Sequence, residues 1–408
     1  MFVLSLLSPI IRVSSAQLVT PLSIFNSSIP MPVGIASYGL YNVSNATGPY
    51  KIETNEIIGF ARIDSINAYN SSPPANTSAY GATVQLNVVM NVTSVSGNRY
   101  SYWIQDVMDV NTSNRTYVIG DNVWNFTGVI SNVTNETLSG EGNVTPPSSN
   151  DPFSLNFTAG FYSAGFNTTY NLNPPTYFLP VIEVSDPGQH PLARIGYIDN
   201  NRYVFYDNVT FNITAASAYL LVTPYYLTPV RNASSNATGN YYDAEMVLGG
   251  EGSGAIASFN NTNATLWIGY NNGSAIVPFP SVGTFGVDTE EAAVNLTTSQ
   301  SGGNVAVKNG PLNYGQTLYL SGVPAFLQQA TTPAQPTTTV ATNYTTTQAT
   351  TILPSASQNQ SNASTSVGSP TPPSGTGGSD SAIVAAVAVM GVAIIYLIIR
   401  SMRRSAKG

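Results

Sequence analysis

The stretch Tyr100–Asn125, YSYWIQDVMDVNTSNRTYVIGDNVWN, predicts two strands joined by a polar turn. Aromatic and β-branched residues are frequent in both halves, which is typical of strands, and the Asn- and Ser-containing middle favours a turn. Alternate residues of a strand point to opposite faces, so Asp106 shares a face with Tyr102 and Met108, whereas Asp109 takes the other face. Asp106 and Asp109 therefore do not form a catalytic pair.

Further strands are predicted by the same composition at Ala82–Val95, Arg202–Ala215 and Ser217–Val222. In the first of these, apolar residues such as Leu86 alternate with polar ones such as Asn87, as in a strand with one wet side. No amphipathic helix pattern stands out. We predict an all-β fold, either sandwich-like or two packed β-domains, with a candidate seam near residues 146–175.

The two ends of the chain predict export and anchoring. A short apolar run followed by small residues is typical of a signal peptide, and an apolar run of membrane length followed by basic residues predicts one transmembrane helix with a cytoplasmic tail. The Thr/Ser/Pro-rich tract before it predicts a disordered stalk. The expected segments are 1–16 signal peptide, 17–327 ectodomain, 328–381 stalk, 382–399 transmembrane helix and 400–408 basic tail.

Composition limits the chemistry. The chain has no cysteine and one histidine, His190 in a predicted turn, so a thiol nucleophile or a multi-histidine metal site is excluded. Charged residues make up only 8% of the chain, with 20 acids and 13 Lys and Arg residues, so no nucleic-acid partner is implied. Sparse charge limits self-repulsion in strong acid, and about two dozen Asn-x-Ser/Thr sequons provide glycans as an alternative source of solubility. Catalysis, if present, would rest on carboxylates.

Two acid groups stand out. Asp243 and Glu245 share one strand face with Cα atoms about 6.6 Å apart, although a solvated outer face explains them as well. The densest acid group is Asp288 with Glu290 and Glu291; its Asp-Thr matches the start of the Asp-Thr/Ser-Gly loop of pepsin-like proteases, but Glu290 replaces the glycine. Asp121 and Asp207 each precede Asn and are predicted to lie in Asx-type turns at strand ends. Asp106 is predicted to be a structural acid in an apolar setting. The glycine-rich segment Gly249–Gly254 is predicted to be a flexible loop whose backbone N–H groups could stabilise an oxyanion.

An ordered set of segments resembles the thermopsin family of archaeal acid proteases over roughly residues 30–300. The segments are MPVGIASYGLY (31–41), VQLNVVMNV (84–92), YSYWIQDV (100–107), GDNVWN (120–125), YDNVTF (206–211) and DAEMVLGG (243–250). The resemblance implies a β-rich, disulfide-free, glycosylated endopeptidase that acts outside the cytoplasm in hot acid. The resemblance does not identify the active-site residues of this chain.

We therefore expect a membrane-anchored extracellular acid endopeptidase of type I topology, with protein or peptide substrates, N-linked and O-linked glycans, and no cofactor or metal. The alternative is a non-catalytic, glycosylated cell-surface or adhesion protein on the same scaffold; a glycosidase with two carboxylates has no motif behind it. The candidate catalytic carboxylates, in order of preference, are Glu291, Glu245, Asp243, Asp121, Asp106 and Asp207.

Overall fold

A computed structural model describes most of the predicted ectodomain. The described residues are 30–43, 47–74, 77–127, 131–146, 159–185, 189–228, 240–252, 254–289 and 291–328. The predicted signal peptide, transmembrane helix and basic tail, and the stalk beyond residue 328, lie outside them. Within the described ranges, no helix combines the length and apolar character needed to cross a membrane. The described residues all belong to one compact unit.

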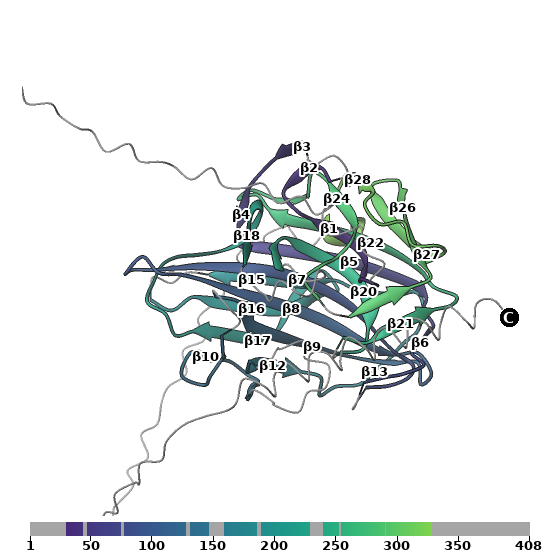
Figure 1. Ribbon diagram of the computed structural model, residues 1–408, viewed down its shortest axis with the longest axis horizontal. Helices are drawn as coiled ribbons and strands as arrows, with labels where there is room; N and C mark the ends of the chain where they lie inside the picture. Colours follow the sequence, from purple (N-terminus) through teal and green to yellow (C-terminus); the bar gives the residue numbers. More distant parts are fainter. Residues whose placement is uncertain are drawn as a thin grey trace, which may run out of the picture. The chain divides into compact units, whose positions relative to one another are not determined.

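Two large antiparallel sheets make up most of this unit (Figure 1). The first sheet has a path of nine strands with four more attached, namely β11 (Asn143–Thr145), β12 (Phe161–Gly165), β9 (Thr116–Asn125), β8 (Arg99–Asn111), β7 (Gly81–Ser94), β20 (Ala244–Gly250), β1 (Val33–Ser37), β24 (Val282–Phe285) and β28 (Thr317–Leu318), with β13 (Tyr170–Asn171), β18 (Ala215–Thr228), β19 (Asn240–Tyr242) and β4 (Ile52–Thr54).

The second sheet has ten strands, and two small sheets and one short helix complete the described structure. The second sheet contains β10 (Leu138–Ser139), β17 (Arg202–Phe211), β16 (Leu192–Asp199), β15 (Pro180–Ser185), β5 (Glu56–Ser65), β22 (Asn263–Asn271), β27 (Asn304–Asn309) and β26 (Leu296–Ser301), with β14 (Thr176–Phe178) and β23 (Ile276–Pro278). The smaller elements are β2 (Leu40–Asn42) with β3 (Thr47–Pro49), β25 (Ala292–Val294) with β21 (Ile256–Phe259) and β6 (Ala68–Tyr69), and α1 (Ala325–Gln328).

The two large sheets pack face to face around one hydrophobic core. Its members include Leu86 and Ile104 from the first sheet and Ile57, Ile182 and Val209 from the second, each essentially without solvent exposure. This core explains why β-branched and aromatic residues recur at every second position of the long strands, since each such position removes apolar surface from water. The prediction of an all-β fold is confirmed, and the two sheets are packed as in a sandwich.

Residues that pair across neighbouring strands form rows across the first sheet, and successive rows point to opposite faces. This alternation decides on which face of the sheet each acid lies. One row crosses the sheet as Ile35, Met246, Leu86, Asp106, Asp121 and Ala164, and faces the core between the sheets. The adjacent row reads Ala36, Glu245, Asn87, Gln105, Asn122 and Ser163, and faces the other way. We call these the inner face and the outer face of the first sheet.

Three local predictions are wrong. The outer face of β7 is not wet, because Gln85 and Asn87 are buried and bonded to one another and to neighbouring strands. The predicted loop Gly249–Gly254 begins later than expected, because Gly249 and Gly250 still pair with β7 within β20. Asp121 and Asp207 stand inside β9 and β17 rather than in turns at strand ends.

Candidate active site

Three carboxylates meet on the outer face of the first sheet, and we call them the acid triad: Asp243, Glu245 and Asp288. One carboxylate oxygen from each lies within 4.8 Å of the others. Asp243 is the single residue between β19 and β20, Glu245 lies in β20, and Asp288 follows β24. Their side chains are 1%, 0% and 6% exposed, so Asp288 lies closest to solvent. The predicted shared face of Asp243 and Glu245 is confirmed, whereas sequence reasoning left Asp288 out of its final candidates.

Backbone and amide N–H groups fix Glu245. The N–H groups of Val287 and Asp288 donate to its Oε1 at 2.5 and 3.1 Å, and Asn87 Nδ2 donates to its Oε2 at 3.1 Å. Gly286 allows the loop to approach, because a Cβ at this position would lie 2.7 Å from Glu245 Oε2. Burial raises the pKa of Glu245, while these donors act in the opposite direction by stabilising the carboxylate. Glu245 therefore ties the loop that carries Asp288 to β20.

Asp243 has the opposite environment. Neither of its carboxylate oxygens meets an N–H or O–H group of the described chain. Its hydrogen-bonding neighbours are the carboxyl groups of Asp288 and Glu245, and two carboxyl groups can bond only when one of them holds a proton. Burial raises the pKa of Asp243 well above its ordinary value, and the negative charges of Asp288 and Glu245 raise it further. Asp243 and Asp288 thus form a close pair of carboxyl groups next to an anchored third acid.

An amide ladder extends from the triad across the outer face. Asn87 donates to Gln85 as well as to Glu245, Gln105 donates to both Gln85 and Asn87, and Asn122 donates to Gln105 at 3.5 Å. Asn122 is partly exposed, so the ladder leads from the buried triad toward solvent. Gln85, Asn87 and Gln105 are buried in this row, so only Asn122 offers part of its amide to solvent.

Glu291, the first choice from sequence, lies beside the triad and is not a member of it. It is partly exposed, it accepts a hydrogen bond from the Thr289 hydroxyl, and it is hydrogen-bonded to Gln85. Burial raises the pKa of Glu291 and also that of Asp109, which reaches about 7 because Glu251 and Glu291 add repulsion. The outer face therefore carries a second, more open group of acids near the same loop.

A separate cluster of acids lies on the inner face between the two sheets. Asp106 and Asp121 are directly opposite one another in β8 and β9, Asp207 reaches them from β17, and all three are fully buried. Tyr206 donates to Asp106 at 2.9 Å, Tyr162 donates to Asp207 at 3.0 Å, and one oxygen of each acid lacks an N–H or O–H partner from the described residues.

The inner cluster also shares protons. Burial raises the pKa of Asp121, the charges of Asp207 and Asp106 raise it further, and the Asp121 and Asp207 carboxyl groups lie within hydrogen-bonding range. Burial likewise raises the pKa of Asp106. All three acids lie between the two sheets at 0% exposure, whereas Asp288 of the acid triad lies on the outer face at 6%. The expectation of a structural role for Asp106 agrees with this burial, and the catalytic role of any of the three stays a prediction.

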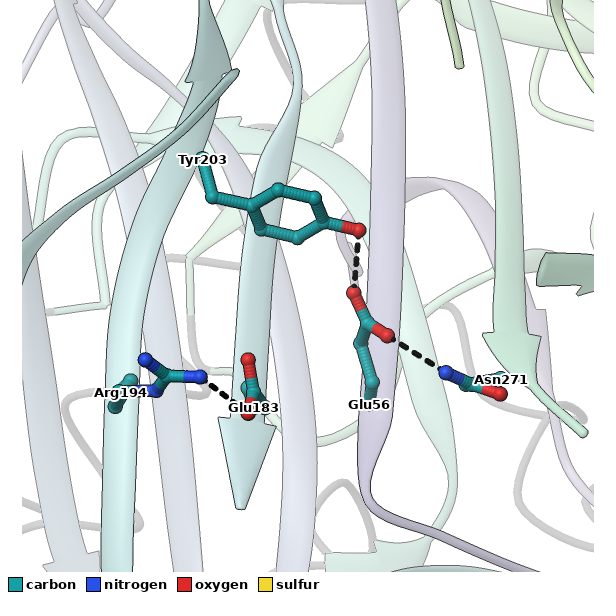
Figure 2. Close-up of polar contacts among 5 residues, drawn as sticks. All are labelled: Glu56, Glu183, Arg194, Tyr203 and Asn271. Carbon is teal, nitrogen blue, oxygen red and sulfur yellow. Dashed lines mark hydrogen bonds and ion pairs between the residues drawn. The ribbon is translucent and has the colours of Figure 1, made fainter. Parts of the chain in front are cut away.

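Two acids of the second sheet, one buried and one partly exposed, have partners, as Figure 2 shows. Glu56 accepts from the Tyr203 hydroxyl at 2.7 Å and from Asn271 at 3.0 Å, and Glu183 pairs with Arg194. Each of these carboxylates has a donor that explains its position. Asp243 differs from them in having none.

A cavity of about 640 Å³ with aromatic walls lies elsewhere in the described structure. Its walls include Tyr117, Tyr170, Tyr177, Tyr197 and Phe326. None of the candidate carboxylates lines it. The triad, in contrast, offers three oxygen ligands at a spacing that could hold a metal ion, which the sequence does not suggest.

Comparison with known proteins agrees with this arrangement of segments. The family model Thermopsin matches residues 17–296. Thermopsin of Sulfolobus acidocaldarius is 35% identical over 300 residues, which cover 73% of this chain and 85% of that protein. The match includes β7, β8, β9, β20 and the loop that carries Asp288. The chain belongs to the thermopsin family.

Proposed function

We propose that this protein is an acid endopeptidase in which Asp243 and Asp288 are the catalytic carboxyl pair and Glu245 is a positioning residue. Membership of a family of acid proteases supports the reaction class. The observation that carries the assignment is the orphaned Asp243, whose two oxygens have only carboxyl groups as hydrogen-bonding neighbours. Both oxygens of Glu245, by comparison, already accept N–H donors.

In the proposed reaction the pair holds one proton between its two carboxyl groups. Asp288, the more exposed member, accepts a proton from a water molecule, and the water oxygen bonds to the scissile carbonyl carbon. Asp243 donates its proton to the amide nitrogen, the C–N bond breaks, and a carboxylic acid and an amine are released. The pair again holds one proton, now taken from the water, so the site is ready for another cycle.

A low working pH agrees with the proposed pair. Burial and the charges of Asp288 and Glu245 raise the pKa of Asp243, which supports a state in which the pair holds one proton in acid. We further propose that the enzyme is extracellular, glycosylated and anchored by residues 382–399. The apolar run, the basic tail and the many sequons support this location.

The test is cleavage of an acid-denatured protein substrate between about pH 1 and 5 by the wild-type chain and three variants. Asp243→Asn and Asp288→Asn are each expected to reduce kcat by about 10²–10⁴-fold, the usual size of a lost general acid or base. Asp106→Asn is the matched control, because it changes a buried acid on the opposite face of the same sheet. It should keep wild-type turnover.

Two outcomes would overturn the proposal. If the wild-type chain cleaves nothing at any pH in this range, the non-catalytic surface protein becomes the better description. If cleavage occurs and Asp106→Asn abolishes it while Asp288→Asn does not, the catalytic pair lies on the inner face instead. Location is tested separately, by glycosidase treatment and by protease digestion of the ectodomain on intact cells.

A further inference from the structure

Asp243 and Glu245 would lie side by side as buried negative charges if both were ionised. The donors to Glu245 are two backbone N–H groups and the Asn87 amide, each with only a partial positive charge, and no N–H or O–H group of the described chain bonds to the oxygens of Asp243. The described ion pairs of Lys and Arg go to other acids. Buried ionised carboxylates require compensation by a charged partner or a metal ion.

A second feature is the orientation of Asp243. It is 1% exposed, it lies within 4.8 Å of both other ligand oxygens, and neither of its own oxygens meets an N–H or O–H donor of the described chain. An unpartnered buried carboxylate aimed at two others is the arrangement expected of a ligand to a cation. Glu56 in the second sheet shows that this protein otherwise supplies donors to its buried acids.

We propose that Asp243, Glu245 and Asp288 also form a binding site for a hard divalent cation of the Ca²⁺ class. Apart from Glu245 Oε1, which already accepts two N–H groups, three carboxylates offer up to five oxygens, and oxygen ligands are preferred by Ca²⁺. Mg²⁺ keeps several waters and is usually bound by one or two carboxylates. A buried set of three carboxyl groups whose ligand oxygens lie within 4.8 Å of one another therefore suits the larger ion.

The hydrogen bonds to Glu245 leave room for this ion. Each carboxylate oxygen has two lone pairs, so Oε2, which accepts from Asn87, keeps capacity for a metal bond. The Asn87 amide then acts as an outer partner that holds the ligand in place, as such groups do in known metal sites. The site thus has three ligands, a fixed orientation for one of them, and a loop closed over it by Val287 and Asp288.

Occupation by the cation has a consequence for the enzyme, and this part rests on the proposed function. The same oxygens of Asp243 and Asp288 would hold either the catalytic proton or the metal ion, and the two compete because ligands bind metal in their deprotonated form. The Ca²⁺-loaded protein is then inactive as a peptidase. At pH values above the acid range, bound Ca²⁺ would keep the peptidase inactive and so protect the cell from its own protease.

The experiment measures binding and not cleavage, so that its result is independent of the catalytic assignment. The full-length chain is titrated with CaCl₂ at pH 6.5 by calorimetry, and its Tm is followed to about 10 mM Ca²⁺, beyond the weak end of extracellular calcium sites. We expect one saturable site and a saturable rise in Tm. Mg²⁺ at equal concentration should bind more weakly.

Variants decide where the ion binds. Asp243→Asn and Asp288→Asn should each weaken the calcium Kd by about 10-fold or more, a loss at least as large as that from outer partners of metal ligands. Asp199→Asn, which changes an exposed acid outside the triad, should bind as the wild type does. If Asp243→Asn does not fold, Asp288→Asn on the loop carries the same test.

Absence of saturable binding, or equal binding by all variants, would overturn the proposal. A chain that cleaves protein in acid yet does not bind Ca²⁺ would reject this site and leave the peptidase standing. Specific binding by a chain that cleaves nothing would leave the cation site and reject the peptidase.

Discussion

The inner cluster makes stability depend on pH in a direction that one substitution can measure. Asp121 is protonated in the folded protein to a pH well above the unfolded pKa of about 3.9, because burial and the neighbouring acids raise its pKa. Over the window between the unfolded and folded pKa values, the folded state binds one more proton than the unfolded state at this residue. Stability from this group is complete below about pH 3.9 and falls as pH rises through the window.

The size of the effect follows from proton counting. One extra bound proton corresponds to a loss of about 1.4 kcal/mol in the free energy of unfolding per pH unit. Asn at position 121 is neutral at every pH, and its amide can donate to Asp207, which has an oxygen without an N–H or O–H partner in the described structure. The Asp121→Asn variant should therefore lose about 1.4 kcal/mol less per pH unit than the wild type.

The assay is urea unfolding followed by tryptophan fluorescence at a series of pH values upward from about 4, where the unfolded aspartate is ionised. Acids with raised pKa values outside the inner cluster, such as Glu251, contribute the same slope to both proteins and cancel in the comparison. Asp199→Asn, an exposed acid, serves as the control and should follow the wild type. Parallel curves for Asp121→Asn and the wild type would refute the reasoning.

Three further substitutions test the packing around the site and the core. Gly286→Ala should cost about 1–3 kcal/mol of stability and most of the peptidase activity, because its Cβ would lie 2.7 Å from Glu245 Oε2. Urea unfolding measures the stability and kcat measures the activity, and wild-type values of both would contradict the close approach. Asn87→Leu should cost about 1–3 kcal/mol, since Glu245 loses a buried donor, and a neutral result in urea unfolding would count against that bond. Trp267→Ala should cost about 3–5 kcal/mol in the same assay, because this fully buried side chain fills the core and donates to the Gly322 carbonyl; a loss below 1 kcal/mol would show that the core is loosely packed there.

Much of the fold follows from local pattern. The stretch Tyr100–Asn125 forms β8 and β9 with the predicted turn between them, and the period of two separates Asp106 from Asp109 as expected. The strand at Ala82–Val95 is β7 within one residue at each end. These predictions succeed because side-chain alternation in a strand is a property of the strand itself.

The partners of the acids do not follow from local pattern. Asp288 reaches Glu245 only because β24 pairs with β1 and β1 pairs with β20, a strand order that joins segments more than 200 residues apart. Asp207 meets Asp121 through the packing of one sheet on the other. The available signals were the strand register around Asp243 and the Asp-Thr dipeptide at 288, and neither gives a distance between segments.

The prediction of a solvent-exposed outer face for β7 was wrong for a related reason. Gln85 and Asn87 look like residues of a wet surface, since polar side chains at alternate positions usually face water. Here they are buried because amides of neighbouring strands and the loop after β24 supply their hydrogen bonds. Polar alternation therefore identified the face but not its environment.

The two faces of β8 and β9 also restrict how this protein family can change with time. Gln105 and Asp106 are adjacent in sequence yet serve opposite sides of the sheet, one in the amide ladder and the other in the proton-sharing cluster. Removing one residue from the middle of either strand would turn all later side chains over and exchange the two sets. Relatives of this protein can accept substitutions in β8 and β9 but not single-residue gaps. Differences in length between relatives should therefore lie in the connections outside these two strands.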